Sequence, residues 1–145
     1  MNTVAEILKA KGTTVHVVGP EATMRDALKV MTANKIGAVL VVEDKKIHGI
    51  FSERDCVHYL SELDDCSLDT PVTAFMSHPV YYVTLDQTLD DCMAVMTNKR
   101  LRHLPVLQGD ELAGIISIGD VVKLVLSERE AHIKDLENFL WVNLI

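Results

Sequence analysis

The hydrophobic and polar positions of the chain follow one order twice. In each copy a short β-rich stretch, residues 14–18 and 80–84, precedes a Thr-x-x-Asp sequence and apolar residues at helical spacing. Two short apolar runs separated by turn-prone residues come next, within 38–51 and 104–117, and they indicate a β-hairpin. A further helix closes each copy, so the pattern predicts the unit β-α-β-β-α, repeated once.

The two copies also match residue by residue. Residues 15–60 align with residues 80–125 without a gap. Identical pairs include Val15/Val80, Val18/Val83, Thr23/Thr88, Asp26/Asp91, Val30/Val95, Met31/Met96, Val41/Val106, Gly49/Gly114, Ile50/Ile115, Ser52/Ser117 and Asp55/Asp120. Because one copy is too short to bury both faces of its sheet, we expect the copies to pack together as one pseudo-symmetric module.

These patterns divide the chain into three parts. Residues 1–70 hold the first repeat, with a lead-in helix at 4–8 and a linker, and residues 71–127 hold the second, with a matching lead-in at 72–76. Residues 128–145 are predicted to be a C-terminal helical extension. The expected fold class is α/β of the α+β type: two pseudo-symmetric β-α-β-β-α repeats packed together, with a long C-terminal helix.

The C-terminal helix is predicted to run from about Asp120 through Trp141, a stretch without Gly or Pro. Charged residues alternate there with the apolar residues Leu126, Ile133, Leu136, Phe139 and Leu140. This spacing suits a stripe that packs on its own module or on another subunit. Self-association, in the form of a homodimer, is therefore expected.

Composition narrows the classes of function. The 145 residues are 48% hydrophobic and 24% charged, as in an ordinary folded domain. The formal charge of −7 has the wrong sign for holding nucleic acid or an anionic membrane surface, so neither partner is expected. No apolar run approaches the ~20 residues of a membrane span, and residues 1–12 lack the apolar region of a signal peptide, so we expect a cytoplasmic protein.

Cysteine and histidine spacing predicts neither a disulfide framework nor a metal site. Cys56, Cys66 and Cys92 are odd in number and lack CxxC spacing, and the six histidines include no i,i+4 pair. Cys56 follows Asp55 near a predicted helix start. That position leaves two interpretations, a reactive thiol that senses redox state and a buried core residue.

The sequence Gly-h-h-Ser-x-x-Asp, where h is apolar, occurs twice, at residues 49–55 and 114–120. Each copy lies at a predicted strand-to-helix junction. Free backbone N–H groups and the helix dipole favour an anion there, and the serine hydroxyl can add a hydrogen bond to a phosphate oxygen. An aspartate one turn later can accept both hydrogens of a ribose diol.

The same spacing also fits a capping box that stabilises a helix start and binds nothing. Thr23-x-x-Asp26 and Thr88-x-x-Asp91 have this spacing without the preceding glycine-led strand. Spacing alone does not separate a ligand site from a cap.

The ordered repeat, with Gly-h-h-Ser-x-x-Asp at its last junction, resembles a CBS domain, and two copies resemble a CBS pair, or Bateman module. The resemblance covers residues 4–125, and the stretches 51–55, 100–106 and 116–123 are especially similar to small stand-alone members. It implies adenosine-containing ligands, AMP, ATP, NAD(H) or S-adenosylmethionine, in two clefts between the copies. It also implies a disc-like dimer.

The resemblance further implies roles for single residues. Asp55 and Asp120 would hold ribose, and Ser52 and Ser117 would approach phosphate or ribose. The backbone near residues 18, 37–38, 80–82 and 102–104 would flank adenine. The candidate ligand-binding residues are Val18, Gly37, Ala38, Ser52, Glu53, Arg54, Asp55, Val80, Tyr82, Arg100, Arg102, His103, Leu104, Pro105, Ser117, Ile118, Gly119 and Asp120.

An anionic ligand needs local positive charge in a chain this acidic. The phosphate candidates are Arg54, Lys99, Arg100, Arg102 and His103. The alternatives are a solvated helix end for Lys99 and Arg100 and a core histidine for His103. Because the first copy has Gly37-Ala38 where the second has Arg102-His103, the two sites are expected to differ, and the second-repeat site is the predicted AMP site.

These observations predict a non-enzymatic adenine-nucleotide sensor that modulates an unidentified partner protein in trans. AMP is the favoured ligand, with NAD(H) and ATP as the others. The alternatives are a dimeric scaffold with degenerate sites and a redox sensor based on Cys56. An enzyme is not expected, because no nucleophile–base pair recurs, no Walker-type loop is present, and Glu53 or His103 would be a lone base.

Overall fold

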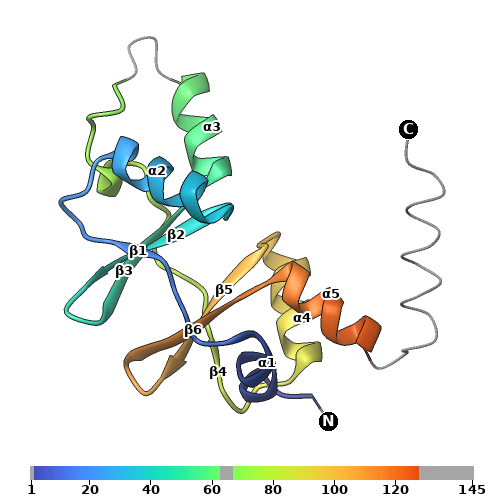
Figure 1. Ribbon diagram of the computed structural model, residues 1–145. Coiled ribbons are helices and arrows are strands. Elements are labelled where there is room, and N and C mark those ends of the chain that lie inside the picture. Colours follow the sequence, from blue (N-terminus) through green and yellow to red (C-terminus); the bar gives the residue numbers. More distant parts are fainter. Residues whose placement is uncertain (1, 63–66, 128–145) are drawn as a thin grey trace, which may run out of the picture.

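The computed structural model describes residues 2–62 and 67–127. In the first half lie the helices α1 (Val4–Lys11), α2 (Met24–Asn34) and α3 (Glu53–Glu62) and the strands β1 (Val17–Val18), β2 (Ala38–Glu43) and β3 (Lys46–Ser52). In the second half lie the 3-10 turn η1 (Val72–Ala74), the helices α4 (Leu89–Lys99) and α5 (Ile118–Ser127) and the strands β4 (Val83–Thr84), β5 (His103–Gln108) and β6 (Glu111–Ser117). The predicted β-α-β-β-α repeat is confirmed in both halves (Figure 1).

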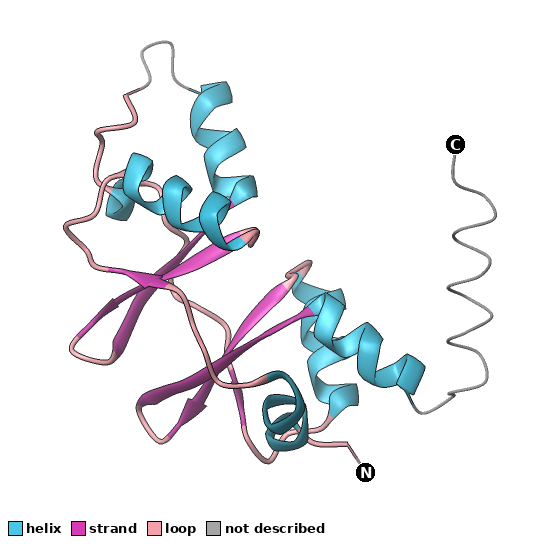
Figure 2. Cartoon of the chain, in the orientation of Figure 1, coloured by secondary structure: helices cyan, strands magenta, loops and turns pink. Residues whose placement is uncertain are grey.

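Each repeat forms its own three-stranded sheet, with its helices on one side (Figure 2). In the first sheet β1 pairs parallel to β2, and β2 pairs antiparallel to β3; β4, β5 and β6 repeat this arrangement. The register agrees as well, since Val18 pairs with Val41 and Val83 with Val106. The duplication therefore extends from sequence to strand register.

The helices α2 and α4 begin and end alike. Thr23 and Thr88 form complete capping boxes with Asp26 and Asp91, as the spacing predicts. Each helix stops at a residue in the left-handed region, Lys35 and Arg100, both with φ 54°. In the second repeat this turn places Arg100 between α4 and β5, three residues before the strand begins.

The two cores exchange their lead-in segments. Val4, Ile7 and Leu8 of α1 are buried in the core of the second repeat, and the Val4 N–H donates to the carbonyl of Gln87 at 2.8 Å. Conversely, Val72 of η1 is buried in the core of the first repeat. Each lead-in therefore completes the other repeat, which holds the repeats together without a shared sheet.

The lead-ins differ in form: one is an eight-residue helix and the other a single 3-10 turn. Each lead-in packs closely against a strand at a glycine, Gly49 in β3 and Gly114 in β6. A Cβ at Gly49 would meet the Met76 side chain, and one at Gly114 would meet Leu8.

The predicted C-terminal extension, residues 128–145, and Cys66 lie outside the described residues. Among residues 2–62 and 67–127, no helix combines the length and apolar character that a bilayer crossing requires.

Candidate functional site

The two serine–aspartate corners have the same internal geometry. At the first, the Ser52 backbone N–H and hydroxyl donate to Asp55 Oδ2 at 2.9 and 3.0 Å, and the Asp55 N–H donates to Ser52 Oγ at 3.3 Å. At the second, the corresponding distances between Ser117 and Asp120 are 2.8, 2.9 and 3.2 Å. The capping arrangement is thus present at both corners, where it also fixes the direction of each carboxylate.

Asp55 has a second partner from the segment that follows η1. The Ser77 hydroxyl donates to Asp55 Oδ1 at 2.9 Å. Ser77 is held there because its backbone exchanges two hydrogen bonds with Ile50 of β3, at 2.8 and 3.1 Å. Both oxygens of Asp55 therefore accept from neutral or backbone donors.

Asp120 has a cationic partner instead. Lys11, the last residue of α1, donates from Nζ to Asp120 Oδ2 at 2.5 Å and to the carbonyl of Ile115 at 2.8 Å. Burial would raise the pKa of Asp120, but the hydrogen bonds from Lys11 and Ser117 and the charge of Lys11 lower it below its ordinary value. The second corner therefore holds a built-in ion pair.

A small cavity of about 100 Å³ lies beside the first corner. Both repeats contribute to it. Its lining residues are Gly37, Ala38, Ile50, Ser52, Arg54, Asp55, Ser77, Arg100, Leu101, Arg102 and His103. We call it the arginine cleft, because three arginines, Arg54, Arg100 and Arg102, line it together with Asp55.

Charge across the arginine cleft links the two repeats. Arg102 of the second repeat lies 3.9 Å from the carboxylate of Glu53 in the first, measured from NH2 to Oε2. Burial and the positive charges of Arg102 and Lys11 lower the pKa of His103. His103 is thus held towards its neutral form, and the permanent positive charge in the cleft comes from arginines.

The second corner opens on a different cavity of about 270 Å³ between α1 and α5. Lys11, Asp120 and Lys123 supply its charged groups, and Ile7, Ala10, Leu124 and Ser127 complete the lining. Ser117, Ile118 and Gly119 belong to the corner but do not line this cavity.

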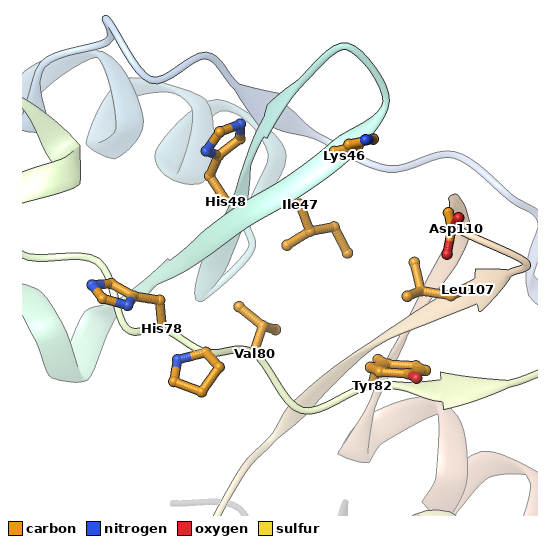
Figure 3. A pocket seen from close by; sticks show the side chains of 9 residues that line it. Lys46, Ile47, His48, His78, Val80, Tyr82, Leu107 and Asp110 are labelled. Atoms are coloured by element: carbon orange, nitrogen blue, oxygen red, sulfur yellow. The ribbon is translucent and has the colours of Figure 1, made fainter.

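The remaining ligand-binding residues predicted from the sequence do not line either of these cavities. The side chains of Val18, Leu104 and Pro105 are buried, so only their main chain is available to a ligand. Val80 and Tyr82 line a third cavity of about 480 Å³ at the hairpin ends, opposite Lys46 and His48 of β3 (Figure 3).

Lys99 is not among the residues of the arginine cleft. Its ammonium lies 5.2 Å from the centre of the Tyr81 ring, a cation–π arrangement on the surface. The interpretation of Lys99 as part of a solvated helix end is therefore the better one, whereas Arg100 reaches the cleft.

Two residues that contact the corners, Ser77 and Lys11, are absent from the sequence candidates. Both precede the aligned repeats, so a comparison of the copies passes over them. The signal in the sequence was their position: Lys11 ends one lead-in segment and Ser77 follows the other, and each lead-in packs on the core of the other repeat.

Cys56 does not have the environment of a reactive thiol. It is half-buried against the first core, and burial raises the pKa of its thiol. A redox-sensing cysteine needs a lowered pKa, so this environment favours the interpretation of Cys56 as a core residue. Within the part of the chain that the structure describes, no three His, Cys, Asp or Glu residues gather as a metal site would require.

Comparisons with known proteins agree with this architecture. The family model for the CBS domain matches residues 4–62 and 72–127. The CBS domain-containing protein CBSX3, mitochondrial, of Arabidopsis thaliana is 30% identical over 147 residues, which cover 95% of this chain and 71% of that protein. A CBS-domain containing protein of Agrobacterium tumefaciens has a crystal structure with a TM-score of 0.81 and 41% identity, covering 85% of this chain and 98% of that one.

A further solved structure is described as CBSX2 in complex with AMP. It has a TM-score of 0.75 and 25% identity, and the match covers 89% of this chain and 99% of that one. Two matches to the family model, two copies of one fold and solved structures with the same arrangement all agree: this chain belongs to the CBS-domain family, as a tandem pair.

Proposed function

We propose that this chain is an adenine-nucleotide-binding regulatory module, with AMP favoured over ATP and NAD(H). The observation that carries the proposal is the arginine cleft. A serine–aspartate corner of the first repeat faces the Arg100–His103 segment of the second across it. A ligand in this cleft would contact both repeats and so couple occupancy to their relative packing.

Each part of a nucleoside monophosphate has a chemical partner there. The carboxylate of Asp55 can accept both hydrogens of a ribose diol once the Ser77 hydroxyl rotates away from Oδ1. Arg54, Arg100 and Arg102 offer charge-assisted hydrogen bonds to a phosphate.

The cleft has to widen for a ligand of this size. Its volume of about 100 Å³ is below the roughly 300–1,000 Å³ of small-molecule sites. The Arg102 side chain is 63% exposed and pairs only at 3.9 Å with Glu53, so it can move at little cost. Binding would then exchange the Glu53 carboxylate for a ligand phosphate and loosen a contact between the repeats.

The relative described as CBSX2 in complex with AMP supports AMP as the ligand class. The regulated partner, and the cytoplasm as the place of action, are part of the same proposal. A regulatory role fits the site better than catalysis, because its groups are suited to holding a phosphate and a diol. The two hydroxyls of the cleft, Ser52 and Ser77, both donate to Asp55, and among the described residues neither is hydrogen-bonded to His103 or Glu53 as a nucleophile would be to its base.

The homodimer is also part of the proposal. Val57 and Leu60 of α3 are 66% and 53% exposed. Their counterparts on α5 are exposed as well: Val122 at 48% and Val125 at 37%. Matched apolar stripes on two helices suit a second copy of the chain. A monomeric mass in light scattering at micromolar concentration would remove the dimer from the proposal.

The test of the function compares two aspartates that cap helices in the same way. Wild type, Asp55→Asn and Asp26→Asn are melted with AMP, ADP, ATP, NAD, NADH and S-adenosylmethionine. Ligand at 100 times its dissociation constant stabilises by about 2.7 kcal/mol, which raises Tm by roughly 5–10 °C for a chain of this length. Asp55→Asn should lose most of the AMP shift, whereas Asp26→Asn should keep it.

Two outcomes would contradict this assignment. Equal AMP shifts in both variants would make Asp55 a cap and nothing more. No shift of the wild type with any of the six compounds would favour a dimeric scaffold with degenerate sites, which the capping geometry of both corners also fits. The prediction that the second corner is the AMP site is tested by Asp120→Asn in the same panel.

A further inference from the structure

The second corner is occupied by a side chain of the protein itself. Lys11 Nζ donates to Asp120 Oδ2 and to the carbonyl of Ile115, and the two side chains are only 27% and 16% exposed. The counterpart at the first corner is the neutral hydroxyl of Ser77. This is the largest chemical difference between the corners.

The position of this ammonium decides what a ligand has to displace. Asp120 Oδ2 accepts from Ser117 and from Lys11, so a ribose diol would compete with Lys11 for the carboxylate. A neutral nucleoside would leave the ammonium without its carboxylate in a partly closed place, which is unfavourable. A phosphorylated nucleoside brings a replacement anion.

The charges of the cavity support such an exchange. Lys11 and Lys123 line it together with one carboxylate, Asp120. Once a diol engages Asp120, two ammonium groups face the cavity, and a phosphate satisfies them.

We propose that Lys11 makes the second corner selective for phosphorylated nucleosides, because its ammonium moves from Asp120 to the ligand phosphate when the ribose binds. This inference rests on the proposed function. It assigns the second site a selectivity that comes from a displaced lysine, whereas the arginines of the cleft would supply it at the first site. Lys11 acts here as a specificity-determining residue.

The experiment isolates the second corner in the full-length chain with the Asp55→Asn substitution. Calorimetric titrations measure adenosine and AMP binding to this variant alone and in combination with Lys11→Met, Lys11→Arg or Lys9→Met. Lys9 lies exposed on the same helix, so Lys9→Met controls for the loss of one positive charge from α1.

Lys11→Met should lower the preference for AMP over adenosine by about ten-fold or more, the change that one charge-assisted hydrogen bond carries. It should do so from both sides, weakening AMP and strengthening adenosine. Lys11→Arg should keep the preference, and so should Lys9→Met. A general loss of structure would weaken both ligands together and leave their ratio unchanged.

Two results would overturn the inference, and they are distinguishable. If AMP and adenosine bind every variant with an unchanged ratio, Lys11 does not select and the proposed function still holds. If neither ligand binds even to the wild type, the proposed function fails and the role of Lys11 fails with it.

Discussion

The two serine–aspartate corners are copies of one another that are not chemically equal. Their three internal hydrogen bonds differ by only 0.1 Å from one corner to the other. Yet Ser77 meets Asp55 with a hydroxyl, and Lys11 meets Asp120 with an ammonium. The corner itself is the same in both repeats. The difference comes from Ser77 and Lys11, which belong to segments that precede the aligned residues.

The exchange of lead-in segments explains how this difference arises. The chain before each repeat packs on the other repeat, so each corner receives a side chain from a segment that the alignment does not constrain. Backbone geometry and ligand chemistry can therefore change independently. A tandem pair built in this way can hold two different sites without altering its fold.

The largest effect is expected from removing two of the three arginines that line the arginine cleft. Arg100→Ala combined with Arg102→Ala should weaken AMP binding about 100-fold, roughly ten-fold for each charge-assisted hydrogen bond, and should change adenosine binding much less. Titration calorimetry measures both affinities. Lys35→Ala is the matched control, because Lys35 ends α2 with the same φ of 54° as Arg100 ends α4 but does not line the arginine cleft.

An equal loss of AMP and adenosine binding in the double variant would contradict this prediction. It would mean that the arginines shape the cleft without contacting phosphate, and the comparison between the corners would then rest on Lys11 alone.

A smaller effect is expected from pushing residues 76–77, which follow η1, away from β3. A Cβ at Gly49 would meet the Met76 side chain and lie 3.1 Å from the carbonyl oxygen of Ser77, which is backbone and yields less easily. Gly49→Ala should therefore destabilise the chain by about 1–3 kcal/mol, the usual cost of overpacking, and move Ser77 away from Asp55. Urea unfolding followed by circular dichroism measures the loss.

Gly114→Ala is the comparison in the second repeat. The three atoms nearest to its Cβ all belong to the Leu8 side chain and none to the backbone, so the substitution should cost less. An equal or larger loss for Gly114→Ala would show that the Ser77 backbone resists the added Cβ no more than the Leu8 side chain does.

Sequence patterns predicted the repeat, the capping boxes and the corners, because these depend on local spacing and on apolar periodicity. They did not predict Ser77 and Lys11, because these side chains reach the corners through tertiary packing. Lys11 contacts Asp120, which lies more than a hundred residues further along the chain. The order of the segments along the chain also placed residues 4–8 with the first repeat, whereas the core places them with the second.

The candidates near adenine show the same limit. Val80 and Tyr82 were predicted to lie near adenine because of their position in the second repeat. In the structure they line a cavity separate from the one beside Asp55. The sequence specifies which strand carries a residue, and the packing of the two sheets decides which opening that residue faces.

The smallest effect concerns His103, which occupies in the second repeat the place of Ala38 in the first. Burial and the charges of Arg102 and Lys11 lower its pKa, while Glu53 and Asp120 oppose this shift. Below the ordinary histidine pKa of about 6.5, the unfolded chain therefore binds more protons than the folded chain, so stability falls as the pH drops from there towards the lowered pKa. His103→Gln should flatten the curve of unfolding free energy against pH below about pH 6.5. The measurement is urea unfolding at several pH values, and an unchanged slope in His103→Gln would assign the acid sensitivity to other groups and remove this titratable difference between the two halves.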